Sequence, residues 1–179
     1  AAGTEIAATE LSAIGGSTTG VVTVNEAIVI TGTASEVEAA LVTADTKVEA
    51  PTALVEISNP VSVLQVNEID AVTSGVITAT ISDNAASTLA TLSGTGNAYT
   101  ITVDGEATAA ELIAIDGATT VEVDASGVTA VTGTAAEINQ VLGLAGLSFG
   151  DDADFVVTIT DAAGTEIAAT ELSAIGGST

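Results

Sequence analysis

The densest cluster of side chains with the chemistry of a binding site is the acidic segment Asp151-Asp152-Ala153-Asp154. Carboxylates close together on a loop can share one hard cation, because Ca²⁺ prefers several oxygen ligands. The segment therefore predicts a metal site in which Asp151, Asp152 and Asp154 bind calcium. A charged loop tip that binds no cofactor at all is the alternative.

Catalysis has few candidate residues in this chain. Nucleophilic mechanisms of the Ser-His or Cys-His type are excluded because the sequence has neither His nor Cys. Lys47, the one basic residue, reads as an exposed loop lysine rather than an activated one, which would need a desolvated pocket. Close pairs among 24 acidic residues are inevitable, and only Tyr99, Phe149 and Phe155 could serve as the aromatic platforms of a glycosidase cleft. We therefore expect no enzyme.

The charge balance excludes several classes of partner. Asp and Glu number 24 against one basic residue, so the formal net charge is -23 at pH 7. Binding to nucleic acid or to an anionic lipid surface requires basic side chains that neutralise phosphates, and we expect neither partner. The hydrophobic fraction of 47% indicates a folded chain, while the absence of a run of 18 apolar residues predicts no transmembrane segment.

Eighteen residues occur twice in the chain. Ala1 to Thr18 read AAGTEIAATELSAIGGST, and Ala162 to Thr179 repeat these letters with an offset of 161. Such a duplication predicts a tandem array. On this interpretation residues 1–161 form one full repeat period, residues 162–179 begin the next copy, and residues 1–179 form a single domain.

A helix-like phrase recurs between these copies. Its apolar residues lie three or four apart, as on one face of a helix. Three of the phrases follow a T-x-x-E capping box, formed by Thr33 with Glu36, Thr108 with Glu111 and Thr134 with Glu137. The phrases lie at 10–14, 36–41, 68–72, 88–92, 111–115, 137–142 and 171–175.

Short runs with a period of two lie between the helical phrases and predict β-strands. The main runs are 22–25, 55–58, 79–82, 101–104, 121–124 and 157–160, and two further runs are 27–31 and 128–132. Strands that alternate with short helices favour parallel pairing, and units this short favour coils that stack on their neighbours. We predict an α/β solenoid with about six coils per 161 residues; a mostly-β parallel β-helix is the alternative.

The outward positions of the six main runs could form a ladder along a stack of strands. They read Thr23, Glu56, Thr80, Thr102, Glu122 and Thr158. A regular threonine ladder on a solenoid can bind ice, but acidic residues interrupt this one twice. A solvated sheet face that carries β-branched polar residues is the simpler interpretation.

Two stretches carry a resemblance to a known class of repeats. Ile115-Asp116-Gly117-Ala118-Thr119-Thr120 and the segment from Ser126 to Glu137 resemble the repeats of very large secreted and cell-surface proteins of cyanobacteria and other marine bacteria. The resemblance implies adhesion or motility, and many such proteins carry calcium-binding repeats. The calcium-binding nonapeptide G-G-x-G-x-D does not occur in this sequence.

Together these observations predict a structural protein of the bacterial cell surface or the extracellular medium, which forms a stalk, fibre, filament or surface layer. Its expected partners are further copies of itself, either stacked head to tail or joined covalently as neighbouring repeats. The alternative is an adhesin module that binds calcium or a cell-surface glycan.

Overall fold

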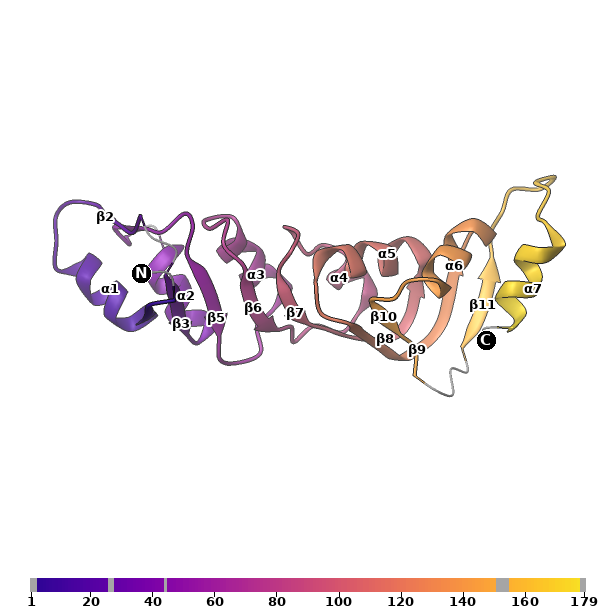
Figure 1. The fold of residues 1–179 in the computed structure, drawn as a ribbon, viewed down its shortest axis with the longest axis horizontal. Coiled ribbons are helices and arrows are strands. Elements are labelled where there is room, and N and C mark those ends of the chain that lie inside the picture. The colour runs from indigo at the N-terminus through magenta and orange to yellow at the C-terminus, as the bar shows by residue number, and fades with distance from the viewer. Residues whose placement is uncertain (1–2, 26–27, 44, 151–154, 178–179) are drawn as a thin grey trace. The chain divides into compact units, whose positions relative to one another are not determined.

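The computed structural model describes residues 3–25, 28–43, 45–150 and 155–177 (Figure 1). The chain divides into two compact units. The first is Ala1–Ser82 with Leu92–Thr100, and the second is Asp83–Thr91 with Ile101–Thr179. The predicted single solenoid domain over residues 1–179 stays a prediction.

The first unit is built on a parallel sheet whose strands follow one another in chain order, β1-β3-β5-β6-β7. A separate parallel pair joins β2 to β4. The strands are β1 (Glu5–Ala7), β2 (Val22–Thr23), β3 (Val29–Gly32), β4 (Val48–Glu49), β5 (Leu54–Ile57), β6 (Ile77–Thr80) and β7 (Ala98–Thr100).

Helices follow the first three strands of this sheet. They are α1 (Ala8–Gly16), α2 (Ala34–Leu41) and α3 (Val63–Asp70). Helix α1 contacts α2, and α2 contacts α3. The paired residues Ile6, Ile30, Val55 and Ile77 form one column across the sheet, so each turn of the chain takes 22 to 25 residues.

The second unit has the same plan around one long strand, β9, which pairs in parallel with β8, β10 and β11. Its helices contact one another in chain order, from α4 to α7. The elements are α4 (Ala86–Leu89), β8 (Thr102–Thr108), α5 (Ala109–Ala118), β9 (Val123–Gly133), α6 (Ala135–Leu142), β10 (Leu147–Ser148), β11 (Val156–Ile159) and α7 (Ala169–Gly177).

The structure confirms all three predicted capping boxes. In each box the Glu Oε2 accepts from the N–H and the hydroxyl of the Thr that precedes the helix, at 2.8 or 2.9 Å. The backbone N–H of that Thr and then its hydroxyl hold the pKa of Glu36, and likewise that of Glu137, below the ordinary value. These hydrogen bonds fix where each helix begins.

Two of the helices also receive a cap from the following turn of the chain. Asn59 Oδ1 accepts from Ala34 N–H at the start of α2, at 2.8 Å. Asp161 Oδ2 accepts from Ala135 N–H at the start of α6, again at 2.8 Å. Each bond satisfies an N–H that has no partner within its own helix, and it locks the register between successive turns.

The predicted element boundaries need correction at three places. Helix α3 begins at Val63, five residues before the predicted phrase, because Ser62 and Gln65 form a capping box of the S-x-x-Q type. Residues 123–124 of one predicted strand and all of the predicted strand 128–132 belong to one strand, β9, which begins two residues later than predicted. The runs directly before the Thr33 and Thr134 caps supply main-sheet strands, whereas Val22 and Thr23 pair only with β4.

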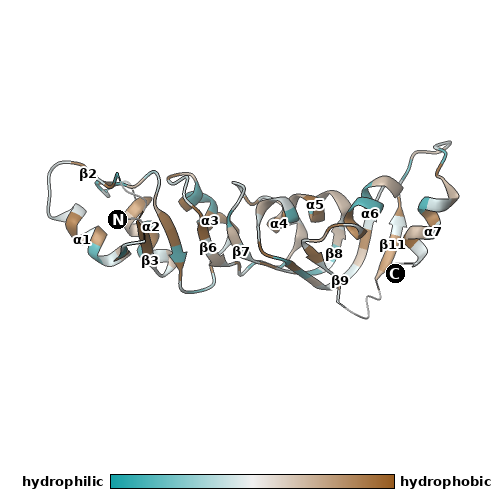
Figure 2. Cartoon of the chain, viewed as in Figure 1, coloured by the Kyte–Doolittle hydropathy of each residue, from teal (hydrophilic) through white to brown (hydrophobic). Residues whose placement is uncertain are grey.

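The fold class is therefore α/β with parallel strands in several sheets, and the strands of the described segments close into no barrel. Most buried residues of the strands and helices are aliphatic, and Figure 2 colours the strands and helices in mixed hydrophobic and hydrophilic shades along each element. Among the described residues, no helix has both the length and the apolar character needed to cross a membrane.

Substitution of Thr33 by Ala tests the importance of the capping box. We expect Thr33→Ala to lower the free energy of unfolding by about 1 kcal/mol, because the hydroxyl that accepts at the helix start is lost. The same variant raises the pKa of Glu36 toward its ordinary value, since one of its two donors is removed. Urea unfolding and an NMR titration of the carboxyl carbons measure the two effects.

Ser35→Ala is the matched control, because Ser35 is exposed one residue into the same helix turn. It keeps the box, so the pKa of Glu36 and the unfolding midpoint should stay within the error of the wild type. Equal destabilisation by the two variants would contradict the capping role.

Candidate functional site

The predicted calcium ligands Asp151, Asp152 and Asp154 lie outside the described residues, so the calcium site stays a prediction. Elsewhere in the described part of the chain, no three acidic side chains gather closely enough to hold a metal ion. The structure therefore directs attention to other features.

Lys47 is held within the first unit as a structural tie. Its Nζ donates to the carbonyl oxygen of Thr18 at 2.8 Å, and its own carbonyl oxygen accepts from Val22 N–H at 2.7 Å. Both bonds fasten the loop after α1 to the strand β4. The side chain is part-buried in this role rather than presented on an exposed loop.

The outward positions that the sequence aligns do not form one column. Glu56 pairs with Thr78 rather than with Thr80, and Thr23 lies opposite Glu49 in a separate sheet. Burial alternates as predicted in the runs 55–58, 79–82 and 101–104, whereas Val121 in the run 121–124 is exposed. Alternation does not determine how far one strand slides along its neighbour. No continuous threonine ladder therefore spans the described strands of the first unit.

A polar hollow of about 280 Å³ lies beside the end of α3 in the first unit. Asp70 lines it and accepts from Asn97 Nδ2 at 2.9 Å and from Ser93 Oγ at 3.1 Å. Asn97 in turn accepts from Ile77 N–H in β6. Burial, and then the nearby Asp70 carboxylate, raise the pKa of Tyr99 well above its ordinary value. The network joins a helix end, a loop and a strand.

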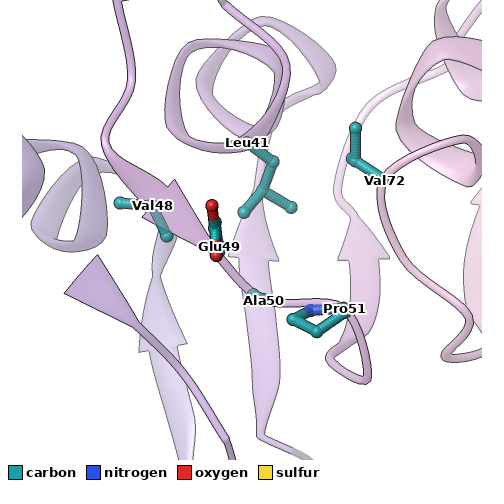
Figure 3. A pocket seen from close by; sticks show the side chains of 6 residues that line it. All are labelled: Leu41, Val48, Glu49, Ala50, Pro51 and Val72. Carbon is teal, nitrogen blue, oxygen red and sulfur yellow. The ribbon is translucent and has the colours of Figure 1, made fainter. Parts of the chain in front are cut away.

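A second, mainly apolar hollow of about 290 Å³ lies between α2 and the segment around β4 (Figure 3). Leu41 points from α2 toward this segment, and Val48 and Val72 lie on opposite sides of Leu41. Glu49 is the one charged residue in the lining. An open hollow at the lower end of ligand-pocket size, with a single charged group, has no convergent chemistry to orient a substrate.

The most distinctive surfaces are the faces of the two helices that share a sequence. In the longer helices between them, the residues at the first, fourth and seventh helical positions are all buried. These are Ala34, Val37 and Ala40 in α2; Val63, Val66 and Ile69 in α3; Ala109, Leu112 and Ile115 in α5; and Ala135, Ile138 and Val141 in α6. A complete helix of this chain therefore buries all three positions.

Helices α1 and α7 each bury only part of this set. Leu11 is 2% exposed in α1, whereas Leu172, the same position in α7, is 46% exposed. The seventh position shows the reverse, since Ile14 is 48% exposed and Ile175 is 5% exposed. The local structure is alike in both helices, so the difference comes from their neighbours.

The neighbours explain this reversal. Helix α1 packs against α2, which follows it, and α7 packs against α6, which precedes it. The first and fourth positions of the phrase therefore face a following helix, and the seventh faces a preceding one. We call the exposed side of α1, marked by Ile14, the head face, and the exposed side of α7, marked by Ala169 and Leu172, the tail face.

Each of these helices follows a strand that has one described partner. In the described part of the chain, β1 pairs only with β3 and β11 pairs only with β9. The letters of β1 recur as Glu166–Ala168, yet these residues are not in a strand. In the first copy β3 pairs with this segment.

Comparison of the chain with protein-family models, with curated protein sequences and with solved structures finds no match in any of the three. The site must therefore be interpreted from its own geometry. The sequence carried one signal for it, the duplicated phrase, but the two environments of that phrase are visible only in the structure.

Two glycines test whether the Asp70 network stabilises the fold. Gly94 and Gly96 both have positive φ, at 75° and 82°, so Ala strains the backbone at either position. A β-carbon added at Gly94 would also overlap the Asp70 carboxylate. A β-carbon added at Gly96 would meet no neighbouring group within 4 Å. We expect Gly94→Ala to cost about 1 to 3 kcal/mol more than Gly96→Ala, because Asp70 must give up hydrogen bonds.

Urea unfolding monitored by circular dichroism measures this difference, with Gly96→Ala as the matched control for strain. Equal costs for the two variants would show that the Asp70 network contributes nothing measurable to stability.

Proposed function

We propose that this chain is a structural, non-enzymatic protein in which β–α turns stack as the coils of a solenoid. The observation that carries the proposal is the order within each unit, where parallel strands and the helices beside them follow one another in chain order. A parallel stack built this way can be extended at either end without changing its plan.

The duplicated phrase supports the same proposal. Helix α7 repeats α1 after 161 residues, and the six helices α1–α6 lie within that period. A repeat of this length that begins again with the same helix is expected of an array. Its products are a stalk, a fibre, a filament or a surface layer.

Charge and composition favour an extracellular location at a cell surface. A chain with a net charge of -23 repels itself strongly, and a saline medium screens that repulsion over about 8 Å at physiological ionic strength. The lack of cysteine removes any dependence on redox conditions.

Distance measurements between two spin labels test the solenoid. Ser35→Cys in α2 and Ala136→Cys in α6 place both labels on exposed residues, and no native cysteine competes for them. Stacked helices lie roughly 8–10 Å apart, so four steps from α2 to α6 predict one narrow distribution centred at about 30–40 Å. The singly labelled chains control for contacts between molecules. A broad distribution would contradict a continuous stack.

Electron microscopy tests the structural role in the native material. We expect antibodies against this chain to label intact, unpermeabilised cells or extended material outside them, because a stalk or surface layer must be exposed. Cells that do not produce the chain are the control. Labelling only after permeabilisation would argue against an extracellular structural protein.

A further inference from the structure

The polar hollow of about 280 Å³ beside the end of α3 lies within the first unit, and Ser74, Thr95 and Gly96 in its lining are exposed to solvent. We propose that it binds a primary ammonium group, the charged end of a small amine or of a lysine side chain. This inference goes beyond the proposed structural role and does not depend on it.

Two hydroxyls that line the hollow have their protons engaged elsewhere. Thr73 Oγ1 donates to the carbonyl oxygen of Ala53 at 2.6 Å and accepts from Gly75 N–H at 3.1 Å. Ser74 Oγ donates to the carbonyl oxygen of Pro51 at 2.8 Å. A hydroxyl that donates its one proton offers a ligand only its remaining lone pairs. Both oxygens are therefore acceptors toward the hollow.

Asp70 supplies a negative charge and further acceptor capacity. An ionised carboxylate accepts at roughly four lone-pair sites. Its Oδ1 accepts from Asn97 Nδ2 at 2.9 Å and its Oδ2 accepts from Ser93 Oγ at 3.1 Å. These bonds fix the carboxylate in place and leave about two sites for a ligand.

The position of Asp70 adds to the negative potential of the hollow. Asp70 is the last residue of α3, where the helix dipole places partial negative charge, and the last turn carries no basic residue. The sole basic side chain of the sequence, Lys47, donates to the carbonyl oxygen of Thr18 instead. One positive charge from a ligand would balance the carboxylate.

A primary ammonium matches this lining better than the other classes of ligand. It carries one positive charge, three N–H donors and no acceptor. An anion would be repelled by Asp70, and a neutral hydroxyl group brings one donor and no charge. Calcium sites draw on several carboxylate and carbonyl oxygens, whereas no three acidic side chains meet in the described part of the chain. Val76, 42% exposed in the lining, offers a contact to the carbon beside the nitrogen.

An NMR titration of the full chain with ethylamine hydrochloride tests the site at about pH 6.5, where such an amine is protonated. Tetramethylammonium chloride keeps the salt concentration constant, because this cation has the same charge but no N–H donor. We expect saturable shifts of the backbone amide signals of Gly94, Thr95 and Gly96. Potassium chloride in place of the ethylamine salt should bind at least tenfold more weakly.

Two substitutions in the lining should weaken the binding of ethylammonium. Asp70→Asn should weaken it at least tenfold, because the variant keeps the shape of the side chain and removes its charge. Ser74→Ala should weaken it by about two- to tenfold, the effect of one hydrogen bond. Ser74 is exposed, so its variant tests the site even if circular dichroism shows that Asp70→Asn does not fold.

Asp116→Asn is the matched control. Asp116 occupies the eighth position of α5, as Asp70 does in α3, and it also approaches a glycine, Gly146. It lies outside the lining of the hollow. The variant therefore makes the same change of charge in a similar setting, and it should bind ethylammonium as the wild type does.

Two further ligands identify the source of the amine. Nα-acetyl-lysine amide presents the side chain of a protein partner, and 1,4-diaminobutane is a free polyamine. Binding of the lysine derivative as tightly as ethylamine assigns the hollow to a lysine side chain, whereas its exclusion while the diamine binds assigns the hollow to small amines. Either result supports the ammonium site.

Four results would overturn the inference. They are the absence of saturable shifts with ethylammonium, equal binding of potassium, unchanged binding by a folded Asp70→Asn variant, and an equal loss of binding in Asp116→Asn. The last of these would show that only the overall charge of the chain matters.

Discussion

A strand followed by one short helix cannot cover its own apolar side, and this constraint determines the rest of the structure. Helices of eight to ten residues are marginal in isolation, so each depends on packing for its stability. In α2, α5 and α6 that packing comes from the helix before and the helix after. Stability is therefore shared between adjacent turns, and a turn at an end of the described chain has an incomplete set of contacts.

Hydrogen bonds between turns determine how the turns align. Asn59 and Asp161 each cap a helix that belongs to the turn before their own. Asn97 and Ser93 bind Asp70 at the end of α3 in a similar way, more than twenty residues earlier in the chain. Apolar burial alone tolerates sliding, whereas these polar contacts require one register.

Much of this architecture follows from local sequence. The capping boxes at Thr33, Thr108 and Thr134 mark helix starts because all their partners lie within three residues. Strand register could not be read in the same way, and the Glu56–Thr78 pair replaced the expected partner of Glu56. Pairing depends on residues more than twenty positions apart, so the periodicity of one strand carries no information about its offset from the next.

The duplicated phrase shows most clearly where sequence reasoning stops. Its letters predict one helix, and both copies form it, with Glu10 and Glu171 each accepting from the N–H three residues before. The letters cannot say which side of that helix is covered, because coverage is a property of the neighbours. Leu11 is buried and Leu172 is exposed although they occupy the same position. The same residue pattern is therefore buried on opposite sides at its two occurrences, because α1 packs against the helix that follows it and α7 against the helix that precedes it.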